Sequence, residues 1–158
     1  MSVNISVHGM QAAMAQIKKE LDRLGGGKFV TVGIHQGAAD PAEGDLTMAA
    51  LGATLHFGDG GKIPPRPWLD TGIEAGASLI AGTIAQGASA NLDLDQILEQ
   101  VGVVAVGAVQ EYMTELQTPP NAPSTIAKKG SANPLIDSGI LRASVTYAIT
   151  TDKPSEGL

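Results

Sequence analysis

Two proline-rich segments constrain the fold more than any other feature of this sequence. Proline fixes its own φ angle, donates no backbone hydrogen bond and pushes the preceding residue out of the helical region. Residues 63–68 are I-P-P-R-P-W, and residues 118–134 contain four of the nine prolines. We therefore expect a rigid extended segment at 63–68 and a long arm at 118–134, with the regular helices and strands elsewhere in the chain.

The chain before the first of these segments shows two kinds of periodicity. Apolar and polar residues alternate at 3–7 and at 30–34, which predicts two strands. Between them, apolar residues recur every three or four positions over 10–24, with charged residues mostly on the other side, which predicts a helix. A loop at 37–45 and a helix at 47–55 follow.

The second half of the chain is predicted to be mainly helical. Thr71 and Glu74 have the spacing of a capping box, so a helix should begin near Thr71. Asp93 and Gln96 form a second such pair, ahead of a helix of about six turns over 94–116. The β-branched residues after position 100 would also suit a strand, but the length favours a helix. A short helix within 135–142 and a strand at 145–149 complete the pattern.

These elements predict an α+β fold. We expect a small, mostly antiparallel sheet packed by three to four α-helices, with the arm at 118–134 extended from it. The length of 158 residues suits one domain that buries roughly 70% of its unfolded surface. We place this domain at 1–151 and a flexible tail at 152–158. The pattern leaves the strand order open.

Composition excludes several classes of protein. The chain has no Cys, which excludes disulfides, zinc–thiolate sites and cysteine nucleophiles, and its net charge of −6 argues against a general nucleic-acid binder. Only 16% of residues are charged, which suggests that partners cover part of the surface. The longest apolar run, 101–109, is far shorter than the ~20 residues of a membrane helix. No signal peptide is visible, so we expect synthesis in the cytoplasm and no membrane contact.

The sequence shows little sign of catalytic chemistry. His8, His35 and His56 are far apart and lack the spacing of metal ligands. There is no G-x-S-x-G elbow and no phosphate-binding loop. We therefore expect no enzymatic activity, no metal and no cofactor. One alternative stays open, a small cytosolic hydrolase whose site assembles in space from His56, Asp137 and Ser138.

The two proline-rich segments carry cationic residues. Arg66 and Trp68 lie on the first, where a stiff backbone lowers the entropy lost on contact with a partner. The alternative is that Trp68 fills the core and Arg66 caps a helix end. Lys128 and Lys129 lie near the end of the second segment, which is either a mobile solvated loop or an arm that orders against a neighbouring subunit.

Taken in order, several segments resemble the neck and tail-completion proteins of tailed bacteriophages, the group around the lambdoid tail-completion protein and the Mu-type virion-morphogenesis proteins. They are V-T-V-G-I at 30–34, M-A-A-L-G-A-T-L-H-F-G at 48–58, I-P-P-R-P-W-L at 63–69 and P-L-I-D-S-G-I-L-R-A-S-V-T-Y at 134–147, with P-P-N-A-P-S-T-I-A-K-K-G at 119–130 leading into the last. The resemblance spans about residues 28–150. His56 is a departure, because many relatives carry an acidic residue there.

The resemblance implies a non-enzymatic virion protein at the head–tail junction. Such a protein forms a ring, with a hexamer favoured over a dodecamer, and contacts connector, tail-terminator or tube proteins. DNA passes through the lumen without sequence-specific binding, which suits an acidic chain. The alternative is a morphogenesis factor absent from the mature virion. We expect contacts from Arg66, Trp68, Lys128, Lys129 and Arg142, on a backbone shaped by Gly58, Pro64, Pro65, Pro67, Asp137 and Gly139.

Overall fold

A computed structural model describes residues 27–35, 47–130, 132–135 and 139–152. Within these ranges the chain forms five helices and one two-stranded sheet, which confirms the α+β class. The elements are β1 (Phe29–Gly33), α2 (Met48–Phe57), α3 (Trp68–Ser89), α4 (Leu94–Glu115), α5 (Pro123–Lys129), α6 (Ile140–Ala143) and β2 (Thr146–Thr150). The predicted strand at 3–7, helix at 10–24, loop at 37–45 and most of the tail at 152–158 lie outside the described residues.

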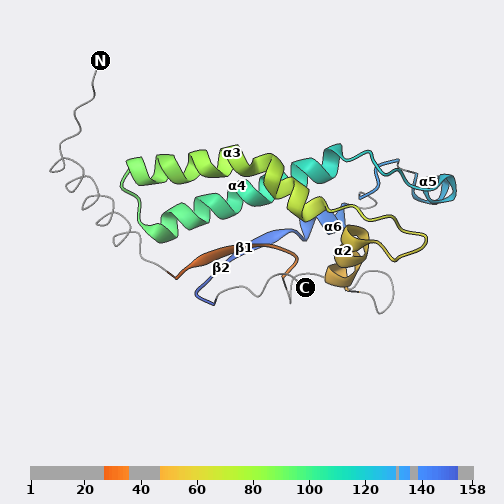
Figure 1. The fold of residues 1–158 in the computed structure, drawn as a ribbon, viewed down its shortest axis with the longest axis horizontal. Helices are drawn as coiled ribbons and strands as arrows, with labels where there is room; N and C mark the ends of the chain where they lie inside the picture. The colour runs from red at the N-terminus through yellow and green to blue at the C-terminus, as the bar shows by residue number, and fades with distance from the viewer. Residues whose placement is uncertain (1–26, 36–46, 131, 136–138, 153–158) are drawn as a thin grey trace, which may run out of the picture.

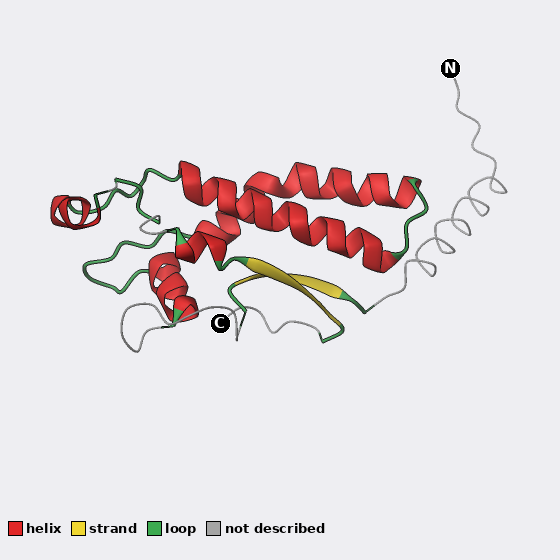
Figure 2. Ribbon diagram, turned by 180° about the vertical axis from the view of Figure 1, so that it is seen from behind, coloured by secondary structure: helices red, strands yellow, loops and turns green. Residues whose placement is uncertain are grey.

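The two long helices dominate the architecture. Helices α3 and α4 lie side by side as an antiparallel hairpin, and the β1–β2 ribbon runs along α4 (Figure 1). Helices α2 and α6 lie near one end of the ribbon, and α5 lies apart from the rest at the far end of the molecule (Figure 2). No helix in the described ranges is both long and apolar enough to cross a bilayer.

The sheet joins the two ends of the described chain. Strands β1 and β2 pair antiparallel, with Phe29 opposite Thr150 and Gly33 opposite Thr146. The ribbon packs on α4 where Gly102 meets the ring of Tyr147, and a Cβ at position 102 would overlap that ring. A glycine is therefore needed at this point of α4 for the sheet to approach it.

The helical hairpin is closely packed because its contacts involve glycine. An added Cβ at Gly72 would lie 2.8 Å from the Cα of Val109, and one at Gly76 would lie 2.5 Å from the Cβ of Ala108. Both distances are shorter than any normal carbon–carbon contact. The alanines and glycines of this chain thus allow the two helix backbones to approach each other closely.

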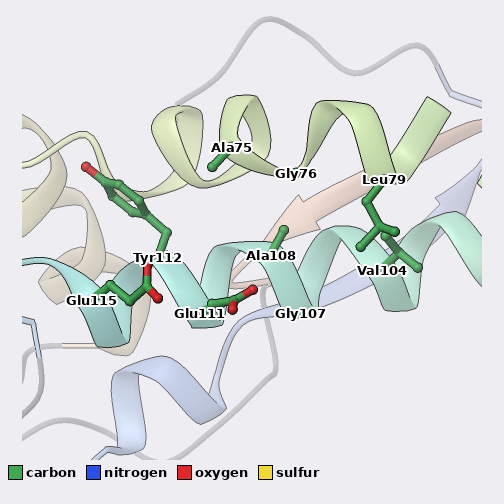
Figure 3. Close-up of a pocket in the computed structure, with 9 residues that line it drawn as sticks. All are labelled: Ala75, Gly76, Leu79, Val104, Gly107, Ala108, Glu111, Tyr112 and Glu115. Carbon is green, nitrogen blue, oxygen red and sulfur yellow. The ribbon is translucent and has the colours of Figure 1, made fainter. Parts of the chain in front are cut away.

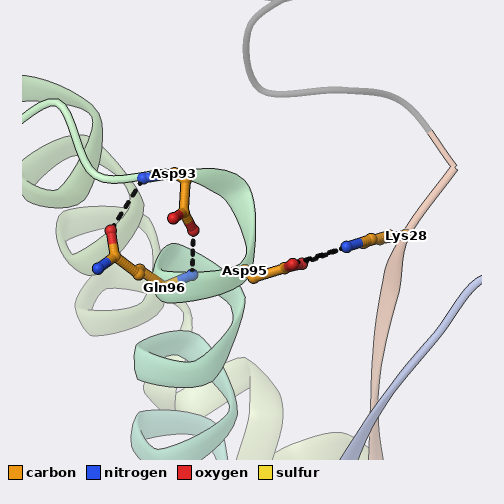
Figure 4. Close-up of polar contacts among 4 residues, drawn as sticks. All are labelled: Lys28, Asp93, Asp95 and Gln96. Atoms are coloured by element: carbon orange, nitrogen blue, oxygen red, sulfur yellow. Dashed lines mark hydrogen bonds and ion pairs between the residues drawn. The ribbon is translucent and has the colours of Figure 1, made fainter.

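The two predicted capping boxes have different outcomes. Asp93 and Gln96 form one at the start of α4, because the Asp93 carboxylate accepts from Gln96 N at 2.9 Å and the Gln96 amide oxygen accepts from Asp93 N at 3.1 Å (Figure 4). The box predicted at Thr71 is wrong, since α3 already begins at Trp68. Pro67 has a φ of −71°, which suits the start of a helix, and its carbonyl accepts from Thr71 N.

An ion pair ties the start of the sheet to the start of α4. The ammonium of Lys28 lies 2.5 Å and 2.7 Å from the two carboxylate oxygens of Asp95 (Figure 4). Both side chains are exposed, so the pair adds little stability, about 0.2–1 kcal/mol.

The hydrophobic core lies between the helical hairpin, α2 and α6. Trp68 is 3% exposed, and its indole N–H donates to the carbonyl of Gly52 at 3.0 Å. The other buried members of this cluster are aliphatic or thioether side chains, namely Met48, Val109, Met113, Leu116, Leu135, Leu141 and Val145. A chain with few aromatic residues therefore builds its core around its one tryptophan.

The arm at 118–134 is not extended throughout. Residues Pro123–Lys129 form the short helix α5, so the prediction of an extended segment is wrong for this part of the arm. Pro123 lies in the first helical turn, where a missing N–H costs nothing, and Gly130 ends the helix with a φ of +72°.

Candidate functional site: a clamped arm and a groove between two helices

Arg66 holds the arm against the body of the protein. The side chain is 3% exposed, and its guanidinium donates from Nε to the carbonyl of Pro119 at 2.9 Å and from Nη2 to that of Pro120 at 3.2 Å. A third, longer contact joins Nη2 to Asn121 Oδ1 at 3.4 Å. Burial lowers the pKa of the guanidinium, which stays protonated because arginine does not lose its proton in proteins.

Two asparagines close the base of the arm. Asn133 donates from Nδ2 to the carbonyls of Met113 and Thr114, at 3.2 Å and 2.8 Å, which fixes the end of the arm to the last turn of α4. Asn121 donates from Nδ2 to the carbonyl of Asn133 at 3.3 Å, so the beginning and the end of the arm are joined directly. We refer to Arg66, Asn121 and Asn133 together as the arm clamp.

The helix that the arm clamp supports has little contact with the rest of the described chain. None of the residues of α5 is buried, and both ribbon views show it beyond the end of the other elements (Figures 1 and 2). It carries Lys128 and Lys129 in its last turn, where cations are favoured by the helix dipole. Lys128 is exposed, whereas Lys129 is half-buried and its ammonium lies 3.5 Å from the carbonyl of Asn133.

A shallow groove runs between α3 and α4. It has a volume of about 400 Å³, and Figure 3 shows small and aliphatic residues such as Gly76, Leu79 and Ala108 along it, with Glu111 and Glu115 toward one end. Its α4 residues lie on the opposite side of that helix from Gly102, which contacts the sheet. The groove therefore opens on the side of the hairpin away from the sheet, and we call it the α3–α4 groove.

The hairpin around this groove carries only acidic charges, and several of its exposed side chains are apolar. Between residues 67 and 127 the chain has seven Asp and Glu residues and no Lys, Arg or His. No charged residue occurs from 75 to 92, yet Leu79 and Ile84 of α3 are 62% and 45% exposed. Val103 of α4 is 60% exposed. A helix with this composition on its exposed side is typical of a surface covered by a partner.

The remaining predicted contact residues lie in different places. Trp68 is in the core, so the interpretation that it fills the core agrees with the structure. The alternative role for Arg66, capping a helix end, is met by its backbone, because its N–H donates to the carbonyls of Leu55 and His56 in the last turn of α2, at 3.1 Å and 3.0 Å. Its guanidinium binds carbonyls of the arm instead. Arg142 is exposed on α6, and its Nη1 donates to Thr114 Oγ1 at 3.0 Å.

The residues expected to shape the backbone are placed around α2, α3 and α6. Gly58 ends α2 with a φ of +77°, and an added Cβ there would lie 2.7 Å from the carbonyl oxygen of Ile63. Pro64 is half-buried, Pro65 is exposed and Pro67 precedes α3. Gly139, with a φ of +79°, precedes α6, and Asp137 lies outside the described residues.

The structure places only one residue of the candidate hydrolase site, since Asp137 and Ser138 lie outside the described ranges. His56 is 8% exposed, with its Nε2 3.4 Å from the carboxylate of Asp70 and its ring edge-on to Phe57 and Trp68. The contacts with Trp68 and Phe57 leave this imidazole largely shielded from solvent. No group of three possible metal ligands occurs among the described residues.

Asn121 and Asn133 of the arm clamp were not identified from the sequence, and neither was the α3–α4 groove. The asparagines bind backbone carbonyls, which leave no mark in the sequence of the partner segment. The groove has a visible signal, the stretch from 67 to 127 that contains no cationic residue.

Comparison with known proteins identified no relative. No protein-family model matches the sequence, and neither the curated proteins nor the solved structures include one that is significantly similar to it.

Proposed function

We propose that this protein is a structural subunit of a tailed-bacteriophage virion, a neck or tail-completion protein at the head–tail junction. It assembles into a ring, joins the head to the tail and lets DNA pass through the lumen. It is made in the host cytoplasm and needs no cofactor. The observation that carries the proposal is the clamped arm, because an ordered segment that buries little of its own surface suits contact with a neighbouring subunit.

The positions of the segments that resemble phage neck proteins support this assignment. An added Cβ at Gly52 would lie 2.9 Å from Ile34, 3.3 Å from Trp68 and 3.5 Å from Leu141. These four residues come from the four segments 30–34, 48–58, 63–69 and 134–147. The resemblance thus resides in one contiguous part of the fold, and Arg66 of that part also holds the arm.

The charge distribution suits a conduit for DNA. A basic wall would bind the phosphate backbone through counterion release, whereas an acidic wall leaves DNA free to slide. The hairpin of α3 and α4 has seven carboxylates and no cation between residues 67 and 127, and one of the seven, Asp95, is paired with Lys28, which precedes β1. A ring whose inner wall is dominated by Lys and Arg would argue against this part of the proposal.

The test is deletion of the gene from the phage genome that encodes it, followed by electron microscopy of the lysate. We expect DNA-filled heads beside complete but unattached tails, and rescue by the chain supplied from a plasmid. A Ser138→Ala variant should rescue equally well, since joining needs no nucleophile. Normal infectious particles from the deletion phage would contradict the proposal. Mass spectrometry of purified virions separates a virion component, which is retained, from a morphogenesis factor, which is absent.

A further inference from the structure

We propose that α5 of one subunit docks into the α3–α4 groove of a second copy of this chain. The inference rests on the proposed function, because it supplies the head-to-tail contact that a ring requires. Both surfaces lie in the described part of the chain. Helix α5 provides cations, and the α3–α4 groove provides carboxylates.

The arm is fixed at its base while its helix α5 stays unburied, as expected of a segment that binds a partner. Ordering a residue costs about 1–2 kcal/mol of backbone entropy, which burial within the subunit normally offsets. Helix α5 has no buried residue, yet the arm clamp fixes its base through the contacts of Arg66, Asn121 and Asn133. A contact outside the subunit supplies the burial that α5 lacks.

The charges of the two surfaces are complementary. Residues 123–129 contain Lys128 and Lys129 and no acidic residue. The α3–α4 groove contains Glu111 and Glu115, in a stretch without any cation of its own. Two lysines of one subunit can therefore pair with two glutamates of the next, with no like charge from the groove opposing them.

The apolar parts of the two surfaces also match. Helix α5 presents the exposed Ala127 next to Lys128, whereas Ile126 is half-buried. The groove offers Leu79, Val104 and Ala108, and its volume of about 400 Å³ suits a few small side chains and excludes a whole helix. The contact thus places an apolar centre beside a charged rim, as in other protein interfaces.

A contact between two different surfaces has a defined consequence for assembly. Each subunit gives its arm to one neighbour and receives the arm of another, so the contact is heterologous and closes into a ring or continues as a filament. The proposed neck ring needs this type of contact.

Charge exchange between the two surfaces tests the proposal in the full-length chain. An arm variant, Lys128→Glu with Lys129→Glu, and a groove variant, Glu111→Lys with Glu115→Lys, should each weaken self-association by about tenfold or more. Mixing the two variants should restore it, because each acidic arm then meets a basic groove and each basic arm an acidic groove. The measurement is sedimentation velocity together with native mass spectrometry.

A matched control changes the same number of charges elsewhere. Lys62 and Asp152 are exposed and lie outside both surfaces, so Lys62→Glu with Asp152→Lys should leave self-association unchanged. Circular dichroism of every variant separates loss of contact from loss of fold. The arm and groove changes affect exposed or half-exposed side chains, which favours retention of the fold.

Cross-linking provides a second measurement that does not depend on the charge variants. The chain has no Cys, so Ala127→Cys on one copy and Leu79→Cys on another offer one defined disulfide. We expect rapid formation of the mixed dimer under mild oxidation. Ala127→Cys paired with Ser89→Cys, at the far end of α3, should form it slowly.

Three results would overturn the inference. They are a full-length chain that stays monomeric, charge variants that associate like the unaltered protein, and cross-linking no faster than in the control pair. The phage deletion tests the proposed function and is interpreted independently of the docking test. Separate heads and tails with a failed docking test would leave the proposed function standing through another surface. Normal particles with a successful docking test would leave the contact standing and remove the proposed function.

Discussion

At the residue scale, Arg66 and Trp68 show how neighbouring side chains of one rigid segment take separate structural roles. Trp68 packs into the core and donates its indole N–H to α2, whereas Arg66 points its guanidinium at the carbonyls that begin the arm. Both side chains are 3% exposed. The rigid 63–68 segment therefore positions Trp68 in the core and, through Arg66, positions the arm at the surface.

Replacement of Arg66 by Lys tests this role. Lysine keeps the positive charge but cannot reach the carbonyls of Pro119 and Pro120 with a planar fork. We expect a loss of about 1–3 kcal/mol in the free energy of unfolding and faster amide hydrogen exchange at Ile126 and Gly130, whose N–H groups bond within the arm. Urea denaturation and exchange measured by NMR check this. Exchange in α5 that is unchanged would show that the clamp does not order the arm.

Asp59 gives a pH-dependent prediction. Its carboxylate accepts from the backbone N–H groups of Ile63 at 2.8 Å and Gly61 at 2.9 Å, and these bonds hold its pKa below the usual 3.8, the bond from Ile63 most of all. A carboxyl whose pKa is lowered by folding stabilises the fold above its unfolded pKa and loses that contribution as the pH falls through the folded value. The carboxyl carbon should titrate with a midpoint below 3.8 by NMR, and the Ile63 amide should follow it. A midpoint at or above 3.8 would contradict this geometry.

At the scale of elements, the closeness of α3 and α4 depends on particular glycines. Gly76→Ala would bring a Cβ to 2.5 Å from that of Ala108, which we expect to cost about 1–3 kcal/mol through overpacking. Gly82 lies in the same helix with nothing within 4 Å of an added Cβ, so Gly82→Ala should stabilise the protein by about 0.5–1 kcal/mol. Thermal and urea unfolding of the two variants should therefore shift in opposite directions. Shifts of the same sign would contradict the packing described.

Local sequence patterns predicted most elements because periodicity and caps are local properties. Both described strands and the long helices were found where alternation and three- to four-residue spacing placed them, and the Asp93–Gln96 capping box was correct. The start of α3 was wrong because Pro67, not Thr71, precedes the first turn. Helix α5 was missed because three prolines outweighed the short helical run after Pro123.

The candidate site was harder to predict, for a physical reason. Arg66 and the two lysines were selected from the sequence, but the arm clamp depends on carbonyls that only the fold brings near. Asn133 reaches back 20 positions to Met113. Such contacts between a side chain and a distant backbone follow from the path of the chain and have no pattern of their own.

At the scale of the whole molecule, the separation of charges predicts how assembly responds to salt. The proposed contact pairs lysines of α5 with glutamates of the α3–α4 groove, and the Debye length falls from about 10 Å at 0.1 M to about 3 Å at 1 M salt. Self-association measured by sedimentation should weaken steadily over this range. Association that strengthens with salt would show that the exposed apolar residues of α3, and not the charges, hold the subunits together.

The closed base of the arm allows the arm and the core to change independently of one another. Asn121 and Asn133 meet at 3.3 Å, so the segment between them leaves the body and returns to it at nearly the same point. The length and sequence of this segment can therefore change without moving the core around Trp68. In the proposed ring, a change in this segment would alter which subunits recognise one another while the rest of the protein keeps its sequence.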